Sequence, residues 1–320
     1  MLNTYKPEGM LLGAQQNREL LSLGRIGLER AMLAGTILES TALLCDSEMN
    51  LHIDLHGIIG IIPREEVCYN QNGDESKEIA IITRVGKPVC FKVMSIEEKD
   101  GRVCAYLSRR AAQIECMRNY ISDLIPGDIV CSRVTHLESF GAFVDIGCGI
   151  ISLLTVDCIS VSRFSHPRDR LYSGMVINTV IKSFDEEKGR IFVSMRELLG
   201  TWEENAAGFA CGQTVAGVIR SVESYGIFVE LTPNLAGLAE IREDMPNMAD
   251  SCGRLAAVYI KSIIPERMKI KLVLIDSYKG EIGKPELKYY VDCDKTTHIN
   301  SWRYSPENCR KIIQTNFEII

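Results

Sequence analysis

The chain has 320 residues, of which 46% are hydrophobic and 24% are charged, and it carries a formal net charge of −6. This length predicts two or three domains, and the composition is typical of a globular protein. The acidic balance argues against a protein that binds nucleic acid through a broadly basic surface. No apolar run reaches about 18 residues, so we expect neither membrane insertion nor secretion.

In chain order, residues 1–34 are predicted to be an N-terminal helical segment, with its helix over 11–34. Residues 35–112 contain alternating β runs broken by Gly-containing turns, which predict a first, diverged five-stranded barrel. Residues 113–125 are predicted to be a helical linker, because apolar residues recur at helical spacing until Pro126 ends the helix.

Residues 126–197 and 212–276 are predicted to be the second and third barrels, because about 70 residues with five short strands suit a closed barrel that leaves no exposed edge. Between them, residues 198–211 are predicted to be a helical linker whose Thr201 and Glu204 have the spacing of a capping box. Residues 277–320 are expected to form a small α+β extension. We predict a hairpin from 286–293 and 297–304, and a short helix over 306–315.

One motif supports the repeated barrels. Residues 140–146 read FGAFVDI and residues 225–231 read YGIFVEL, each at the start of a predicted strand. A motif that recurs with its framework indicates a repeated domain. Two aromatic side chains beside a glycine offer flat faces on which single-stranded bases can stack. The first copy has Met49 and His52 in place of the two aromatics, so we expect its stacking surface to be largely missing.

These segments resemble the S1 RNA-binding domain family, an oligonucleotide-binding barrel. The resemblance rests on Gly-Asp-Ile-Val at 127–130, Phe-Gly-Ala-Phe-Val-Asp at 140–145, Gly-Arg-Ile at 189–191 and the His-Pro pair at 166–167. It covers roughly residues 35–275 and is strongest in the second copy. The whole chain resembles three-repeat bacterial proteins of clostridial type that are similar to ribosomal protein S1.

The resemblance implies RNA-binding residues of four kinds: strand aromatics, a histidine on the next strand, an aspartate, and a basic residue near the last turn. Thr155 and Glu240 occupy the histidine position in the second and third copies, and Ile264 occupies the aspartate position in the third. We therefore expect the second copy to bind RNA best and the first to bind it least. The candidate RNA-binding residues are Phe140, Phe143, Arg163, His166, Arg168, Asp185, Arg190, Tyr225, Phe228 and Lys269.

Simpler readings of these residues remain open at this point. Phe143 and Phe228 could be core residues, because alternation alone does not fix which face of a strand points outward. His166 could cap a turn. The basic loop around Arg163, Arg168 and Arg170 could be solvated without contacting phosphate.

The sequence favours a single-stranded RNA-binding protein that acts on mRNA or on the ribosome in translation, with the small ribosomal subunit as a possible partner. The alternative is a protein-interaction scaffold whose degenerate barrels dock a ribosome or an RNA-processing enzyme. No P-loop, G-x-S-x-G or H-E-x-x-H motif occurs, so we expect neither an enzyme nor a cofactor. The twelve cysteines are scattered without C-x-x-C spacing, which favours reduced thiols in a cytoplasmic protein over disulfides or a metal site. The sequence does not indicate an oligomeric state.

Overall fold

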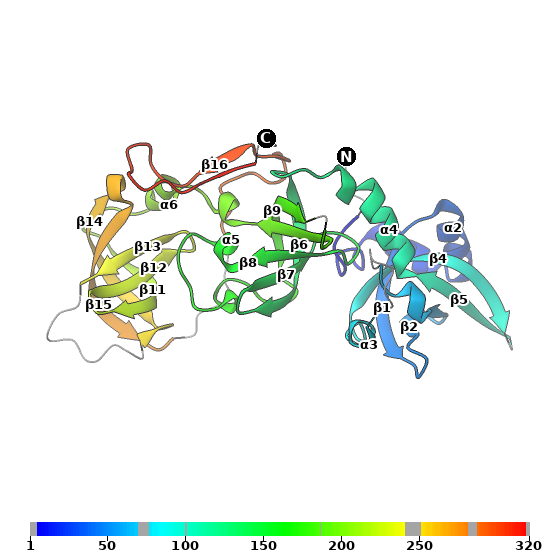
Figure 1. Ribbon diagram of the computed structural model, residues 1–320. Helices are drawn as coiled ribbons and strands as arrows, with labels where there is room; N and C mark the ends of the chain where they lie inside the picture. The colour runs from blue at the N-terminus through cyan, green and yellow to red at the C-terminus, as the bar shows by residue number, and fades with distance from the viewer. Residues whose placement is uncertain are drawn as a thin grey trace. The chain divides into compact units, whose positions relative to one another are not determined.

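The computed structural model describes residues 5–69, 77–99, 101–185, 187–240, 251–280 and 287–317. Strands dominate these residues and form three closed barrels, which confirms the predicted mainly-β fold (Figure 1). The chain divides into two compact units. One contains 1–124, 131–133 and 145–151, and the other contains 125–130, 134–144 and 152–320.

Barrel 1 belongs to the first unit and has the strand order β1-β2-β3-β5-β4. Its core contains Leu38, Ile53, Phe91 and Leu107, and the N-terminal helices add Leu28 to it. Instead of one N-terminal helix there are two, because Gly24 adopts a positive φ of 55° between them. The elements of this unit are α1 (Gln15–Ser22), α2 (Arg25–Ala34), β1 (Leu38–Cys45), β2 (Leu51–Asp54), β3 (Ile59–Ile62), η1 (Arg64–Glu66), α3 (Glu78–Ile82), β4 (Pro88–Lys99), β5 (Arg102–Ser108), α4 (Arg109–Asn119) and η2 (Ile121–Asp123).

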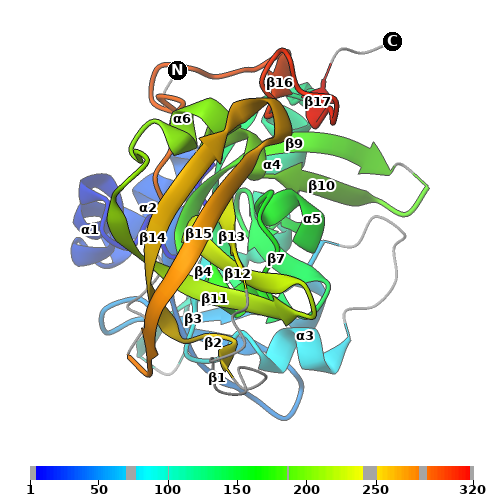
Figure 2. The ribbon, with the colours of Figure 1, turned by 90° about the vertical axis from the view of Figure 1, so that its left-hand side faces the viewer.

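Barrels 2 and 3 have corresponding strand orders, β10-β8-β7-β6-β9 and β11-β12-β13-β15-β14. In each barrel the third and fifth strands pair in parallel and the other ladders with a recorded register are antiparallel. Figure 2 shows β14 and β15 as the long strands of barrel 3. The strands are β6 (Ile129–Glu138), β7 (Gly141–Asp145), β8 (Ile151–Thr155), β9 (Val176–Asp185), β10 (Arg190–Ser194), β11 (Thr214–Glu223), β12 (Gly226–Thr232), β13 (Leu235–Ala239), β14 (Leu255–Ile264) and β15 (Lys269–Tyr278).

Short helices connect the strands of the second unit. Thr201 and Glu204 form the predicted capping box at the start of α6, which is shorter than the sequence indicates. The short helices are α5 (Val156–Ile159), η3 (Pro167–Asp169), η4 (Arg196–Leu199), α6 (Trp202–Ala206) and η6 (Pro265–Arg267). None of the helices in the described residues is long and apolar enough to cross a membrane.

The C-terminal tail differs from its prediction. Its only strands within 287–317 are β16 (Ser301–Arg303) and β17 (Gln314–Asn316), which pair with each other. The predicted strand over 286–293 and the predicted helix over 306–315 are therefore wrong for the described residues, and Glu286 lies outside them. Tertiary packing overrides the local pattern, because Trp302 and Tyr304 enter the core of barrel 3.

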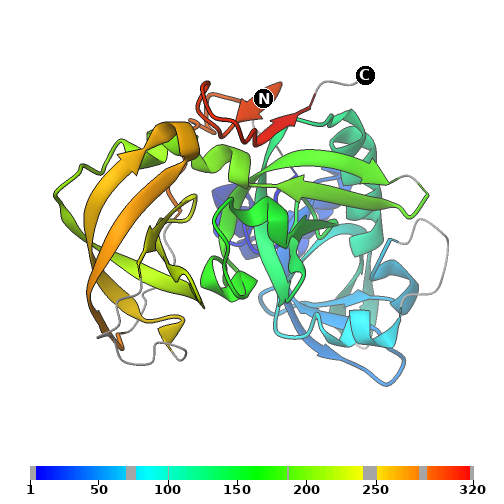
Figure 3. The same ribbon diagram turned by 60° about the vertical axis from the view of Figure 1, so that its left-hand side comes forward.

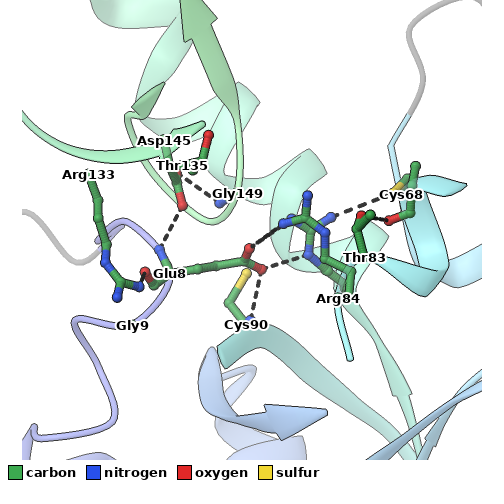
Figure 4. A network of polar contacts seen from close by, with 12 residues as sticks. Glu8, Gly9, Cys68, Thr83, Arg84, Cys90, Arg133, Thr135, Asp145 and Gly149 are labelled. Carbon is green, nitrogen blue, oxygen red and sulfur yellow. Dashed lines mark hydrogen bonds and ion pairs between the residues drawn. The ribbon is translucent and has the colours of Figure 1, made fainter. Parts of the chain in front are cut away.

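The first unit is built around a buried ion pair in the N-terminal segment. Glu8 is 6% exposed and accepts hydrogen bonds from Arg109 Nε at 2.6 Å and Nη2 at 2.9 Å. The amide of Cys90 donates to the same carboxylate at 3.1 Å, and the Glu8 amide donates to Asp145 at 2.7 Å (Figure 4). Burial alone would raise the pKa of Glu8, but the charge and hydrogen bonds of Arg109 hold it below its ordinary value.

We expect Glu8→Gln to destabilise the first unit by about 3–5 kcal/mol, because it leaves the Arg109 guanidinium buried without a counter-charge. Hydrogen exchange of the β4 and β5 amides measures this change. Tryptophan fluorescence reports the second unit separately, since Trp202 and Trp302 both lie there. The control is Arg25→Ala, which removes an exposed pair with Glu29 and should cost less than about 1 kcal/mol. Equal effects of the two substitutions would contradict a central role for Glu8.

A pH dependence follows from Asp145. Burial raises the pKa of Asp145 from 3.8 to about 7, and the negative charge of Glu8 adds to the shift. A carboxyl whose pKa is raised by folding contributes stability at low pH that is lost as the pH rises through the folded value. The first unit should therefore lose stability between about pH 4 and about pH 7, by up to about 1.4 kcal/mol per pH unit.

Asp145→Asn should flatten this dependence, as measured by hydrogen exchange corrected for its intrinsic pH dependence. Burial also raises the pKa of Glu39, but Glu39 is present in both proteins, so the difference between them isolates Asp145. Parallel pH profiles for the two proteins would show that Asp145 does not titrate in this range.

Candidate nucleic-acid interface

A row of outward-facing residues crosses each barrel, with one residue from each strand. In barrel 3 the register places Phe228 beside Ser221 and Leu238, and Lys271 beside Leu238 and Ser262. None of these five residues is buried, whereas their strand neighbours Ile227 and Val229 are 0% exposed. The row therefore lies on the outer surface, and its side chains are available to a ligand.

Barrel 2 carries the same row with different side chains. Phe192 is in register with Leu153 on β8 and with Ser183 on β9. Phe143 takes the position of Phe228, since Ala142 and Val144 on either side are 0% exposed and fill the core. The reading of Phe143 and Phe228 as core residues is therefore wrong, because the alternation of their strands turns both rings outward.

The two aromatic pairs predicted from the motif have the same geometry. The rings of Phe140 and Phe143 are 6.0 Å apart at an interplanar angle of 89°, and those of Tyr225 and Phe228 are 6.1 Å apart at 89°. The first ring of each pair is largely in solvent, with Phe140 51% and Tyr225 65% exposed. Edge-to-face contact between the two rings holds them in place, and a face of the exposed first ring stays free. We call each of these two pairs an aromatic platform.

The glycine between the two aromatics is required by close packing. A Cβ at Gly141 would lie 2.3 Å from the Leu154 carbonyl oxygen, and one at Gly226 would lie 2.9 Å from that of Ala239. No real Cβ approaches an oxygen this closely, so only glycine lets the start of this strand meet the next one. This contact fixes the turn that presents Phe140 and Tyr225 next to the following ring.

Two residues of the barrel 2 row were missed by sequence reasoning. The His136 ring stacks on Phe143 at 6.5 Å and 22°, and its Nε2 lies 2.7 Å from Glu138. His136 lies on β6, before the motif, where the third copy has Ser221. Phe192 lies on β10, where the third copy has Lys271. Alternation along β6 and β10 indicates which of their residues face outward. Only the strand register shows that His136 and Phe192 belong to the row that contains Phe143.

Barrel 1 has the row without the aromatic pair. Leu44, His52, Ile61, Tyr106 and Ser95 are in register across its five strands. The position of Phe143 is held by His52, as predicted, and His52 Nε2 lies 3.0 Å from Asp46. Leu44 and Ile61 are the aliphatic members of this row, and Tyr106 provides an aromatic that the sequence did not indicate.

The predicted acidic and basic RNA-binding positions lie where the fourth strand ends and the fifth strand begins. Arg190 is in register with Asp185, whereas its counterpart Lys269 is in register with Ile264. The side chains of Arg190 and Lys269 are exposed. Thr155, at the predicted histidine position, is half-buried at the end of β8. Glu240, its counterpart, is exposed and lies 3.9 Å from Lys261.

The basic loop of barrel 2 is only partly available. Arg163 and Arg168 are exposed, and His166 accepts a hydrogen bond from the Arg168 amide at 3.1 Å as the cap of a short helix. Arg170, in contrast, is 1% exposed and binds Glu230 through both terminal nitrogens. The interpretation of Arg170 as part of a solvated basic loop is therefore wrong, because its partner is 60 residues away in sequence.

We expect Phe140→Ala to reduce the free energy of unfolding by less than about 1 kcal/mol, because the ring is half in solvent and supports no core. Leu154→Ala, in the neighbouring strand but 0% exposed, should cost about 2–5 kcal/mol. Thermal unfolding of the two variants beside the parent measures the difference. A loss for Phe140→Ala as large as that for Leu154→Ala would mean that the ring serves the core.

Comparison with known proteins places barrel 2 in a domain family. The model of the S1 RNA binding domain matches residues 123–196. Small ribosomal subunit protein bS1 of Leuconostoc lactis is 30% identical over 247 residues, covering 74% of this chain and 54% of that protein. The bS1 protein of Staphylococcus saprophyticus is 30% identical over 200 residues, covering 58% and 50%. The bS1 homolog of Bacillus cereus is 26% identical over 261 residues, covering 77% and 65%.

The chain thus spans about half the length of two of these relatives, 54% of the Leuconostoc lactis protein and 50% of the Staphylococcus saprophyticus protein. Among solved structures, a multidomain protein with nucleic acid binding domains from Streptococcus pneumoniae is 13% identical and covers 75% of this chain and 73% of that chain, with a TM-score of 0.24. The S1 RNA binding domain model thus matches barrel 2, and the chain is similar to bacterial ribosomal protein S1.

Proposed function

We propose that this chain binds single-stranded RNA on the outward rows of barrels 2 and 3, and that it acts on mRNA or at the small ribosomal subunit during translation. The observation that carries the proposal is the pair of aromatic platforms, which repeat the same 89° ring geometry on corresponding strands. Single-stranded bases stack on such faces without requiring a particular sequence.

Stacking also accounts for RNA binding by an acidic chain. Each stacked base is worth about 1–3 kcal/mol, so two platforms give useful affinity with few phosphate contacts. The cations that accompany the rows are few: Arg190 begins the fifth strand of barrel 2, and Lys269 and Lys271 lie on that of barrel 3. Arg163, His166, Arg168 and Asp185 complete the predicted RNA contacts.

The role is proposed to be binding without catalysis, in the cytoplasm. The relatives that match are ribosomal proteins, and the chain covers 33–54% of the length of three of them, so the ribosome as a partner is part of the proposal. We also propose that the chain is divided into the seven segments predicted from the sequence. The three barrels among them are residues 35–112, 126–197 and 212–276.

A second function is favoured by barrel 1 alone. Its row presents Leu44, which is 47% exposed, next to His52, which replaces the platform ring of the other barrels. An aliphatic surface of this kind suits a protein partner better than a base. Barrel 1 is therefore proposed to act as a protein-interaction module, while barrels 2 and 3 bind RNA. If RNA binding fails altogether, the scaffold function takes over the whole chain.

We expect the double substitution Phe140→Ala and Phe143→Ala to weaken binding of labelled poly-U RNA by about 2–6 kcal/mol, because two stacking rings are lost. Tyr225→Ala with Phe228→Ala should have a smaller effect, since barrel 3 lacks the counterparts of His136 and Phe192. Fluorescence anisotropy with the intact chain measures both. Circular dichroism first verifies that the variants are folded.

The matched control is His52→Ala, because His52 holds the position of Phe143 in barrel 1 and should leave the affinity unchanged. The dependence of affinity on salt checks the mechanism separately. The slope of log K against log salt should correspond to few phosphate contacts, at about −0.7 for each. A folded Phe140/Phe143 variant that binds RNA like the parent would show that barrel 2 is not the platform.

A further inference from the structure

The loop between β8 and β9 of barrel 2 is held by an ion network on barrel 3. Arg170 Nη1 donates to Glu230 at 2.8 Å, and Nη2 donates to the other carboxylate oxygen. Arg220 binds the same carboxylate through Nε at 2.8 Å and reaches Asp169 at 3.3 Å. We call Asp169, Arg170, Arg220 and Glu230 the inter-barrel network. Its charges balance, and Phe164 lies 5.0 Å from the Arg170 guanidinium and covers it.

A second connection lies next to this network. Asn234, in the turn between β12 and β13, is 0% exposed. Its side-chain oxygen accepts from the Val161 amide at 2.9 Å, and its side-chain nitrogen donates to the Arg196 carbonyl at 3.0 Å. A single amide of barrel 3 therefore fixes the backbone on both sides of the last barrel 2 strands.

The tail provides a third connection, and Figure 3 shows its orange-to-red ribbon passing over both barrels of the second unit. The Ile129 amide donates to the Thr297 carbonyl at 2.8 Å, and the Ile299 amide donates to the Gly127 carbonyl at 2.9 Å. A few residues later Trp302 and Tyr304 are packed in the core of barrel 3. The tail thus joins the first strand of barrel 2 to barrel 3 through its own backbone.

Connections of three kinds, each buried or backbone-paired, leave little freedom between these parts. Two binding modules held at a fixed distance bind a long ligand as one site, because binding to the second module is then intramolecular and occurs at a high effective concentration. Modules on a free linker do so less well. The spacing matters only to an RNA long enough to reach both platforms.

We propose that the inter-barrel network positions the two aromatic platforms at a fixed spacing, so that barrels 2 and 3 bind one continuous stretch of RNA as a single site. Arg170 is then a positioning residue: it contacts Glu230 and not the RNA. The proposal rests on the proposed function, since it assumes that both platforms bind RNA.

The test compares short and long RNA in the full chain. Arg170→Ala breaks the bidentate pair with Glu230, while Arg220 stays paired with Glu230 and Asp169, so no acidic group is orphaned. The probes are oligo-U of about 5 nucleotides, which reaches one platform, and of about 30 nucleotides, which reaches both. We expect Arg170→Ala to weaken binding of the long RNA by at least about tenfold and that of the short RNA by less than about twofold. Arg310→Ala removes an exposed arginine of the same unit and controls for the loss of one positive charge.

Two results would overturn the proposal. Equal weakening for both lengths would mean that Arg170 contacts RNA or supports the fold of barrel 2. No weakening for either length would mean that the network does not set the spacing. ¹⁵N relaxation without RNA gives an independent readout. The two barrels should tumble with one correlation time in the parent, and the loop amides of 160–172 should gain internal motion in Arg170→Ala. If the parent binds neither RNA, the proposed function fails while the relaxation result still decides whether the barrels form one body.

Discussion

Closure of the barrel by its third and fifth strands is the constraint on which the rest depends. Three pairs of strands are parallel: β3 with β5, β8 with β10, and β13 with β15. In each barrel the fourth strand lies between the two paired strands in the sequence. Closure removes the free edges and sets a single register around the barrel. Once this register is set, one outward residue from each strand falls in a row. The three barrels share a core pattern and differ in what this row presents.

The fold was predictable because its signals are local. Alternation gave the strands, and the FGAFVDI and YGIFVEL segments placed both aromatic pairs correctly. The rest of the row could not be found this way, because it depends on the register between distant strands. In barrel 1 Arg102 pairs with Lys99 at the tip of the β4–β5 hairpin, whereas Arg190 of barrel 2 pairs with Asp185. The partnership of Arg170 with Glu230 and the course of the tail are likewise tertiary, and local patterns contain no record of them.

The positions of two arginines further reduce the positive potential outside this acidic chain. Arg109 and Arg170 are 2% and 1% exposed, and each binds a buried carboxylate. Buried pairs of this kind hold parts of the fold in register but contribute nothing to the field outside the protein. The charge that a phosphate would meet is therefore smaller than the arginine count implies. Rings must then provide the affinity that other nucleic-acid binders obtain from basic side chains.

The Glu8–Arg109 pair has a consequence for synthesis of the chain. Glu8 is made 101 residues before its partner. At about 5–20 residues per second, it waits roughly 5–20 seconds before Arg109 is made, and longer before the arginine emerges. A carboxylate without a counter-charge is too costly to bury, so during this interval the N-terminal segment must stay in water. The part of the first unit that is translated first is consequently among the last to reach its native place.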